Sequence, residues 1–533
     1  MEWLTEYCLV EDFDGFRGVP MTDTSIFVGG GGEGYGTPQQ LLLKYGNRHG
    51  LIAGATGTGK TITLQILAEG FSAAGVPVFM SDVKGDLSGI AKPGSADSKL
   101  HEPFSKRAAT IGHDLQYTAF PVTFWDMFGQ QGHPVRTTVS EMGPLLLARL
   151  MELTEPQEGV LNIAFRLADE EELPLLDLKD LQAMLVWIGQ NAAEIGLRYG
   201  NVSPATVGAI QRQLLVLENQ GAAKFFGEPA LDLADMMQLA PDGRGMVNIL
   251  ASDKLMGSPR LYATFLLWLM SELFETLPEV GDPDKPKLVF FFDEAHLLFD
   301  DAPKALLSKV EQVARLIRSK GVGVYFITQN PADVPDDILG QLSNRVQHAL
   351  RAFTAKDQQD LKRAAQNYRP NPRFDTETAI KEVGTGEAVT SFLEAKGAPG
   401  MVERTLVRPP ASQVGPITPE ERQRIVNASS LWVKYDRTID RDSAFERLQA
   451  RAQDAAAAAS KAKADAETAK AEDREFRNAR RYDDGLPRRS TTSRSSRSDS
   501  LVETFGKSVV RQLGTKTGQA IVRGILGSLF KSR

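Results

Sequence analysis

The stretch that decides the fold runs from residue 54 to residue 61 and reads Gly54-Ala55-Thr56-Gly57-Thr58-Gly59-Lys60-Thr61. It matches G-x-x-x-x-G-K-[S/T], the pattern of a phosphate-binding loop. The apolar residues 51–53 before it predict a strand, and the residues after it predict a helix to about Ala74. Because the motif requires this strand–loop–helix setting, we prefer a phosphate-binding loop to a chance glycine-rich turn.

Each element of this loop has a physical role in holding nucleotide phosphates. The glycines let the backbone turn tightly and direct its N–H groups inward, and the amino end of the following helix adds a favourable dipole. Lys60 neutralises charge on the β- and γ-phosphates, and the Thr61 hydroxyl is a magnesium ligand. We therefore expect ATP and Mg²⁺ as ligands, bound by residues 54–61 and by the next position, Ile62.

A second apolar run ends in two carboxylates. Residues 288–292 are Leu, Val and three Phe, as expected of a central parallel strand covered on both faces, and Asp293 and Glu294 follow directly. Asp293 would coordinate magnesium, directly or through water, and Glu294 would orient and deprotonate the attacking water. A catalytic glutamate favours a hydrolase over a nucleotide-binding switch.

A third strand is expected at residues 322–328, and it ends at a polar side chain, Gln329. Ligands bind at the carboxyl ends of strands in such sheets, so Gln329 can reach the γ-phosphate or the water. The alternative is that Gln329 only caps its loop. Residues 345–352 predict one more strand.

These patterns predict an α/β fold: a RecA-like P-loop NTPase with a mostly parallel central sheet and a helical insertion between the loop and the Asp293-Glu294 strand. We expect seven segments. They are a short strand or hairpin at 1–36, two halves of the ATPase core at 37–139 and 281–418, a helical insertion at 140–280, a helical low-complexity extension at 419–485, a disordered Ser/Arg linker at 486–500 and a basic amphipathic helix at 501–533.

Composition limits the location and the partners of the chain. The sequence shows neither a membrane-spanning apolar run nor a leader at Met1, and its single cysteine, Cys8, fits a reducing compartment, so we expect a cytoplasmic protein. The net charge is −7, but residues 474–533 hold fourteen Lys/Arg against five Asp/Glu. An acidic body argues against a broad nucleic-acid surface, although a basic pore in an oligomer remains compatible with it.

Four motifs spread along the chain match one known group of ATPases. They are Arg48-His49 ahead of the phosphate loop, Asp82-Val83-Lys84-Gly85-Asp86, Asp293-Glu294-Ala295-His296 and Thr328-Gln329-Asn330-Pro331. With them the chain resembles the HerA/FtsK superfamily of hexameric DNA-pumping ATPases, and within it the bacterial YjgR-like group of HerA-like proteins. The resemblance covers nearly the whole chain. It implies a RecA-like fold, a homo-hexameric ring, and ATP hydrolysis coupled to movement along duplex DNA.

The resemblance also implies an arginine supplied by a neighbouring subunit. Family members carry it near the end of the helix before the Thr-Gln strand, and Arg318 has that position here. A guanidinium there spreads charge over the γ-phosphate oxygens as the bond breaks. Arg345 and Arg351 are weaker candidates, and the alternative for Arg318 is a purely solvent-facing role.

Two further hypotheses stay open beside a DNA translocase. The chain could be an ATPase that remodels or pumps a protein, as related secretion ATPases do, or a binding module whose ring is stabilised by ATP. The sequence has no zinc module, helix-turn-helix or aromatic-basic stripe, so DNA is implied mainly by the resemblance. For the basic helix at 501–533, the candidate contacts are a membrane surface, a partner, and the acidic body of this or a neighbouring subunit.

Overall fold

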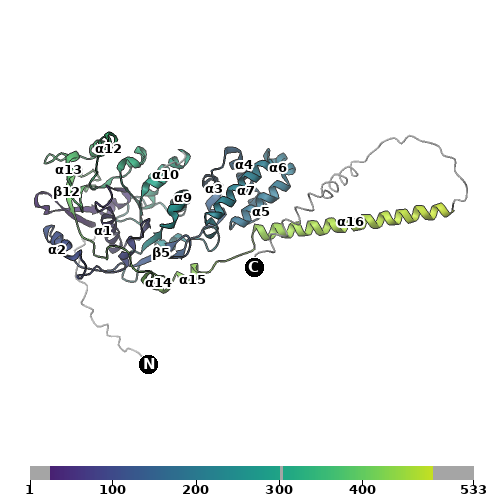
Figure 1. Ribbon diagram of the computed structural model, residues 1–533, viewed down its shortest axis with the longest axis horizontal. Helices are drawn as coiled ribbons and strands as arrows, with labels where there is room; N and C mark the ends of the chain where they lie inside the picture. The colour runs from purple at the N-terminus through teal and green to yellow at the C-terminus, as the bar shows by residue number, and fades with distance from the viewer. Residues whose placement is uncertain (1–23, 300–303, 484–533) are drawn as a thin grey trace, which may run out of the picture. The chain divides into compact units, whose positions relative to one another are not determined.

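A mixed sheet forms the centre of the fold (Figure 1), and it has twelve strands within the residues that the computed structural model describes, 24–299 and 304–483. Their order across the sheet is β2-β1-β12-β11-β10-β3-β9-β8-β4-β7-β5-β6. The strands are β1 (Ser25–Gly31), β2 (Thr37–Leu42), β3 (Gly50–Ala53), β4 (Val78–Asp82), β5 (Val122–Asp126), β6 (His133–Pro134), β7 (Val247–Ala251), β8 (Leu288–Phe292), β9 (Val322–Thr328), β10 (Asn344–Gln347), β11 (Glu387–Ser391) and β12 (Glu403–Val407).

The part of the sheet from β10 to β6 is parallel, and the other edge is antiparallel. β9 pairs in parallel with β3 on one side, ending at Ala53↔Thr328, and with β8 on the other, ending at Phe292↔Phe326. The parallel direction therefore brings the carboxyl ends of β3, β9, β8 and β4 to one edge, where ligands of such sheets bind. The expected α/β fold with a mostly parallel sheet is confirmed.

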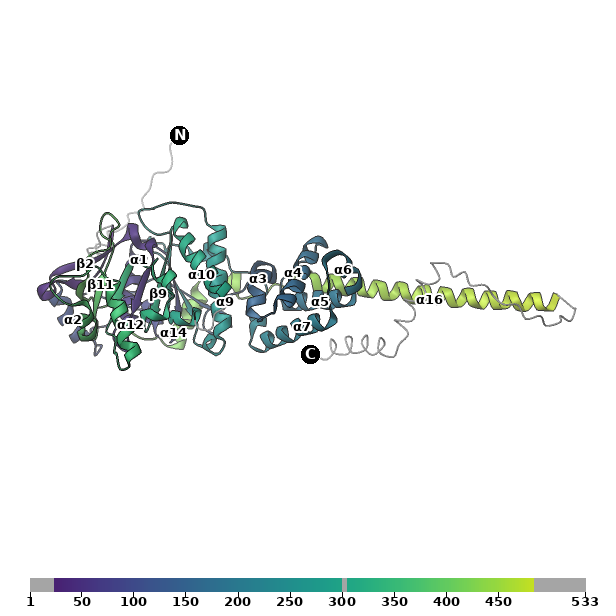
Figure 2. The ribbon, with the colours of Figure 1, turned by 90° about the horizontal axis from the view of Figure 1, so that it is seen from above.

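Helices lie on both faces of this sheet (Figures 1 and 2). The described helices are α1 (Lys60–Ala73), α2 (His101–Thr110), α3 (Val139–Leu150), α4 (Glu155–Glu170), α5 (Leu178–Gln190), α6 (Ala192–Tyr199), α7 (Pro204–Asn219), α8 (Leu233–Met236), α9 (Pro259–Thr276), α10 (Lys304–Ile317), α11 (Asp336–Leu339), α12 (Ala355–Gln366), α13 (Thr376–Glu382), α14 (Pro419–Ala428), α15 (Trp432–Tyr435) and α16 (Ala444–Asp483).

Strand β8 shows why helices must cover both faces of the sheet. Its side chains alternate between two separate cores: Val289 and Phe291 pack with Phe71 of α1, while Phe290 and Phe292 pack in the core that contains α9. All five residues of β8 are buried. A strand buried on both faces reads as a continuous apolar run, which is how the sequence predicted it.

The stretch predicted as a helical insertion, 140–280, contains helices and also one strand of the sheet. Helices α3 to α7 form a cluster beside the sheet (Figures 1 and 2). Inside the stretch 140–280, however, β7 is a buried strand of the sheet and pairs with β4 and β5, and α9 packs on the sheet as well. The sequence did not mark β7 within the predicted helical insertion, because a run of five buried residues is too short to stand out among helical leucines.

Strand β10 also differs from the expected strand at 345–352, since it ends at Gln347. Beyond it the backbone turns along the phosphate loop instead of continuing beside β11. The His348 N–H donates to the Ala53 carbonyl at 2.7 Å, and the Ala55 N–H donates to the Ala349 carbonyl at 2.8 Å. These two hydrogen bonds replace the sheet ladder.

The N-terminal strand β1 pairs with β2 and with β12, so it belongs to the main sheet. After α14 and α15, the long helix α16 begins with Ala444 and Leu448 buried in the larger of two compact units, 1–453. From Asp454, in the second unit, its described side chains are almost all exposed. The expected linker at 486–500 and basic helix at 501–533 lie outside the described residues. Among the described helices, none is both long and apolar enough to span a membrane.

Candidate active site

The phosphate loop joins β3 to α1 and has a backbone path that glycine permits. Gly54, Gly57 and Gly59 have φ values of 151°, 78° and 118°, which side chains disfavour. A Cβ on Gly54 would lie 2.5 Å from the His348 Cβ, and one on Gly59 would lie 3.3 Å from the Gly386 Cα. The loop is therefore pressed against two other segments of the chain, and substitution at either glycine would displace it.

His348 packs against the loop and links it to α1 and β11, a role that the sequence did not predict. One ring nitrogen, Nε2, lies 2.8 Å from the Thr63 hydroxyl of α1, and Nδ1 lies 2.8 Å from the Glu387 carbonyl of β11. Complete burial lowers the pKa of His348 to about 4, so the ring is neutral at pH 7. A lone histidine after a strand carries no motif, so no signal in the sequence marked it.

Lys60 is the first residue of α1, and its ammonium lies within the curl of the loop. Nζ donates to the Gly54 carbonyl at 2.5 Å and to the Ala55 carbonyl at 3.2 Å. Burial lowers its pKa, and the nearby Lys84 ammonium lowers it further. Thr61, half-buried in the first turn, follows it. A cation held only by neutral carbonyls is ready to exchange them for an anionic phosphate.

The acidic pair follows β8, with Asp293 and Glu294 both buried. The Asp293 N–H donates to the Ser81 hydroxyl at 3.2 Å, and Tyr262 donates to the same hydroxyl at 2.7 Å. Burial raises the pKa of Asp293 to about 6. Glu294 has φ 48° and ψ 50°, a left-handed conformation that is uncommon for glutamate. This turn of the backbone lets two adjacent carboxylates serve one site.

The Glu294 carboxylate has three polar neighbours. Lys84 Nζ lies 2.8 Å from Oε1, while Gln329 Nε2 and His296 Nδ1 each lie 3.4 Å from Oε2. Burial alone would raise the pKa of Glu294, but the Lys84 ammonium holds it below the usual value. The structure thus brings Gln329 and Lys84 together around Glu294.

Strand order explains how these side chains meet. β9 lies between β3, which leads into the loop, and β8, which leads into the acidic pair. The Gly54 N–H donates to the Thr328 carbonyl at 3.3 Å, so the loop starts against the end of β9. Gln329 is the next residue along, between the loop and Glu294.

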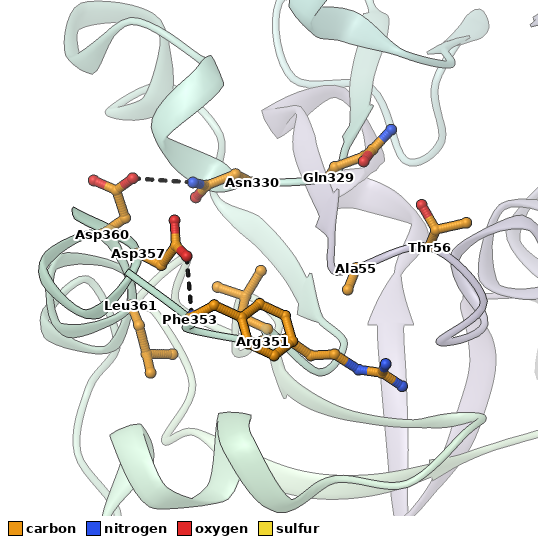
Figure 3. A pocket seen from close by; sticks show the side chains of 10 residues that line it. Ala55, Thr56, Gln329, Asn330, Arg351, Phe353, Asp357, Asp360 and Leu361 are labelled. Carbon is orange, nitrogen blue, oxygen red and sulfur yellow. Dashed lines mark hydrogen bonds between the residues drawn. The ribbon is translucent and has the colours of Figure 1, made fainter. Parts of the chain in front are cut away.

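A cavity of about 350 Å³ opens beside the second and third residues of the loop, Ala55 and Thr56 (Figure 3). Gln329 and Asn330 from the end of β9 line it, as do Arg351 and Phe353 from the segment after β10. On its far wall, the Asn330 side chain donates to Asp360 at 3.1 Å, and Asp357 accepts the Phe353 N–H at 3.0 Å. This hollow lies beside the loop on the side of Gln329.

The three candidate arginines have different surroundings. Arg318 precedes β9, at the opposite end of that strand from Gln329; its side chain is 40% exposed, and its guanidinium lies 3.6 Å from Asp282. Arg345 donates to the carbonyls of Leu339, Leu342 and Asn367, so its guanidinium stabilises the backbone around α11. Arg351 lines the cavity beside the loop of its own subunit.

Within the described part of the chain, no cluster of three or more His, Cys, Asp or Glu could hold a metal by itself. One hydroxyl, Thr61, and one buried carboxylate, Asp293, are a donor set that suits magnesium, because Mg²⁺ bound with nucleotides keeps waters and phosphate oxygens as its other ligands. Thr61 and Asp293 therefore fit Mg²⁺ only when a bound nucleotide supplies phosphate oxygens as further ligands.

The turn after β4 is a further part of the site. The Asp82 carboxylate accepts the N–H groups of Gly85, Asp86 and Leu87 at 2.8, 3.1 and 3.1 Å. Burial raises the pKa of Asp82 to about 7. Because this carboxylate fixes the turn, it also fixes the position from which Lys84 reaches Glu294.

The chain is similar to a known protein family and to several solved structures. The family model described as "Helicase HerA-like C-terminal" matches residues 31–533. No curated protein matches significantly. Similar solved structures include the bacterial conjugative coupling protein TrwBdeltaN70 (15% identity, 73% of this chain and 91% of that chain, TM-score 0.43) and VirB4 of Thermoanaerobacter pseudethanolicus (14%, 73% and 98%, 0.45). Another is plasmid coupling protein TrwB in complex with ADP and Mg²⁺ (15%, 72% and 89%, 0.44).

Proposed function

Because the chain belongs to the helicase HerA-like C-terminal family, we propose that it is a magnesium-dependent ATPase whose hydrolysis drives a ring-shaped motor on duplex DNA. ATP binds on residues 54–61. Glu294 is the general base, and Lys60 and Gln329 assist it.

One observation supports the ATP site of this proposal: the carboxyl ends of β3, β9 and β8 lie at one edge of the sheet, with Gln329 3.4 Å from Glu294 and next to the start of the loop. A phosphate site needs a cradle, a base and a group that orients water within reach of one another. The proximity of residues from three distant parts of the sequence supports the assignment of these roles.

Each residue has a defined task in the proposed reaction. The loop N–H groups and Lys60 bind the β- and γ-phosphates, and Thr61 and Asp293 hold magnesium, which would supply charge neutralisation for the phosphoryl group. Gln329 orients the attacking water, and Glu294 accepts its proton. Burial of both carboxylates excludes other water, which strengthens every charge interaction inside the site.

Arg318 completes the site from a neighbouring subunit in this proposal. It lies at the opposite end of β9 from its own loop, so it cannot serve the site of its own chain, and its side chain is 40% exposed. The pairing with Asp282 is partly exposed and therefore weak, which leaves the arginine available to a neighbour. Arg351 is the second candidate, but it lines the cavity beside the loop of its own chain, so it would act on the site of that chain.

The test is phosphate release by the full-length protein with magnesium, with and without duplex DNA. We expect turnover that duplex DNA stimulates. Turnover that a DNA duplex leaves unchanged would refute the DNA motor and favour the alternative, an ATPase acting on a protein substrate. Absence of turnover under all conditions would leave only nucleotide binding.

A further inference from the structure

Lys84 lies at the site although neither the phosphate loop nor the acidic strand contributes it. It sits on the turn after β4, two residues past Asp82, and β4 pairs directly with β8 (Ser81↔Phe292). Three backbone N–H groups bound to the Asp82 carboxylate fix this turn, and Gly85 gives it a φ of 75°. The backbone of Lys84 is thus held rigidly beside Glu294.

The two partners of the Lys84–Glu294 ion pair differ in their freedom to move. The Glu294 side chain is 8% exposed and held by Gln329 and His296 as well, whereas the Lys84 side chain is 42% exposed. A lysine stem has four rotatable bonds and an ammonium without a preferred direction. Lys84 can therefore change partner while Glu294 stays in place.

The charges around Lys84 favour a move of its ammonium from Glu294 to a γ-phosphate. Lys60 binds neutral carbonyls, and the two ammonium groups repel each other across the site. A γ-phosphate entering beside Lys60 carries more negative charge than one carboxylate, so it competes for the Lys84 ammonium. A carboxylate that keeps its ion pair is a weak proton acceptor, so catalysis gains when Lys84 leaves.

We propose that Lys84 is a γ-phosphate-sensing positioning residue: it holds Glu294 when no triphosphate is bound, and it moves to the γ-phosphate when ATP binds. The move leaves Glu294 free to accept the proton of the attacking water. This inference rests on the proposed ATPase function and adds a group that distinguishes ATP from ADP.

The first test measures the affinities of the full-length protein and its variants for a non-hydrolysable ATP analogue and for ADP, both with magnesium. Lys84→Met keeps the length of the side chain but removes its charge. We expect the analogue to bind about tenfold more weakly, the size of one charge-assisted hydrogen bond, while ADP affinity changes by less than about twofold. Lys84→Arg keeps the charge and should retain most of the preference for the analogue.

Lys92→Met is the matched control. Lys92 is 40% exposed and paired with Glu421 at 2.6 Å, so it has a similar ion pair outside the site. It should bind both nucleotides as the wild type does. A Lys84→Met protein that loses affinity for ADP and for the analogue equally, or for neither, would overturn the proposal.

The second test is a structure of the wild type with the analogue and another with ADP. The proposal requires Lys84 Nζ on a γ-phosphate oxygen in the first and on Glu294 in the second. Lys84 remaining on Glu294 in both would show a static ion pair and refute the transfer. Failure of the proposed function itself would look different, because the wild type would then release no phosphate from ATP, with or without duplex DNA.

Discussion

Replacement of Glu294 by glutamine separates chemistry from binding and folding. Glutamine has the shape of glutamate and keeps a carbonyl oxygen that can accept from Gln329, so the left-handed turn and its packing should survive. The variant loses the negative charge of the Glu294 carboxylate, which lies beside Lys84 and His296. Lys84 is 42% exposed and can turn to water, so the free energy of unfolding should change by at most about 1 kcal/mol.

Turnover should respond far more strongly than stability. Loss of a general base lowers the rate by roughly 100-fold or more, which corresponds to about 3 kcal/mol in the barrier. We therefore expect Glu294→Gln to bind ATP with magnesium, to unfold in urea near the wild-type midpoint, and to release phosphate at about one hundredth of the wild-type rate or less.

The assay is phosphate release under saturating ATP, with nucleotide binding and urea unfolding measured on the same preparation. Glu421→Gln is the control, since Glu421 is also paired with a lysine, Lys92, but lies on α14 outside the site. Normal turnover of Glu294→Gln would refute its assignment as the base. A large fall in stability would show that the residue has a structural role instead.

Three other predictions follow. Arg318→Ala and Lys60→Ala subunits, each inactive alone, should regain partial ATPase activity when mixed, because some interfaces then pair an intact loop with an intact arginine; normal activity of Arg318→Ala alone would favour Arg351. Burial lowers the pKa of His49 to about 4 in the folded protein. In the unfolded chain the pKa of this histidine is near 6.5, so as pH falls the unfolded chain takes up a proton on His49 before the folded protein does. The free energy of unfolding should therefore drop by about 2 kcal/mol from pH 7 to pH 5 on account of His49, and urea titrations of His49→Asn should show a smaller drop. Deleting residues 501–533 should leave ATP hydrolysis intact but weaken assembly; unchanged sedimentation together with lost liposome flotation would instead indicate membrane contact.

Local chemistry explains why so much of the site could be predicted. The loop, the acidic pair and Gln329 are short contiguous motifs, and the strands that carry them are apolar runs whose ends the sequence displays. Strands β8 and β9 therefore begin and end at the predicted residues. The helix after the loop was predicted to about Ala74 and ends at Ala73.

The parts that escaped prediction depend on contacts between distant segments. Lys84 meets Glu294, and His348 meets Thr63, across more than two hundred residues of sequence. Arg345 was a weaker candidate for the arginine that reaches a neighbouring subunit, but its guanidinium donates to carbonyls around α11, which only the tertiary fold brings near. The position of β9 between β3 and β8 follows from packing, which no local pattern encodes.

The most direct test of the account compares magnesium-dependent γ-phosphate release by the wild type and by Lys60→Ala. The Lys60 ammonium contacts the loop carbonyls and its removal leaves the apolar cores intact, so the variant should unfold like the wild type. The account predicts ATP hydrolysis by the wild type and none above background by a folded Lys60→Ala protein. Equal phosphate release by the two proteins would contradict the assignment of residues 54–61 as the ATP site.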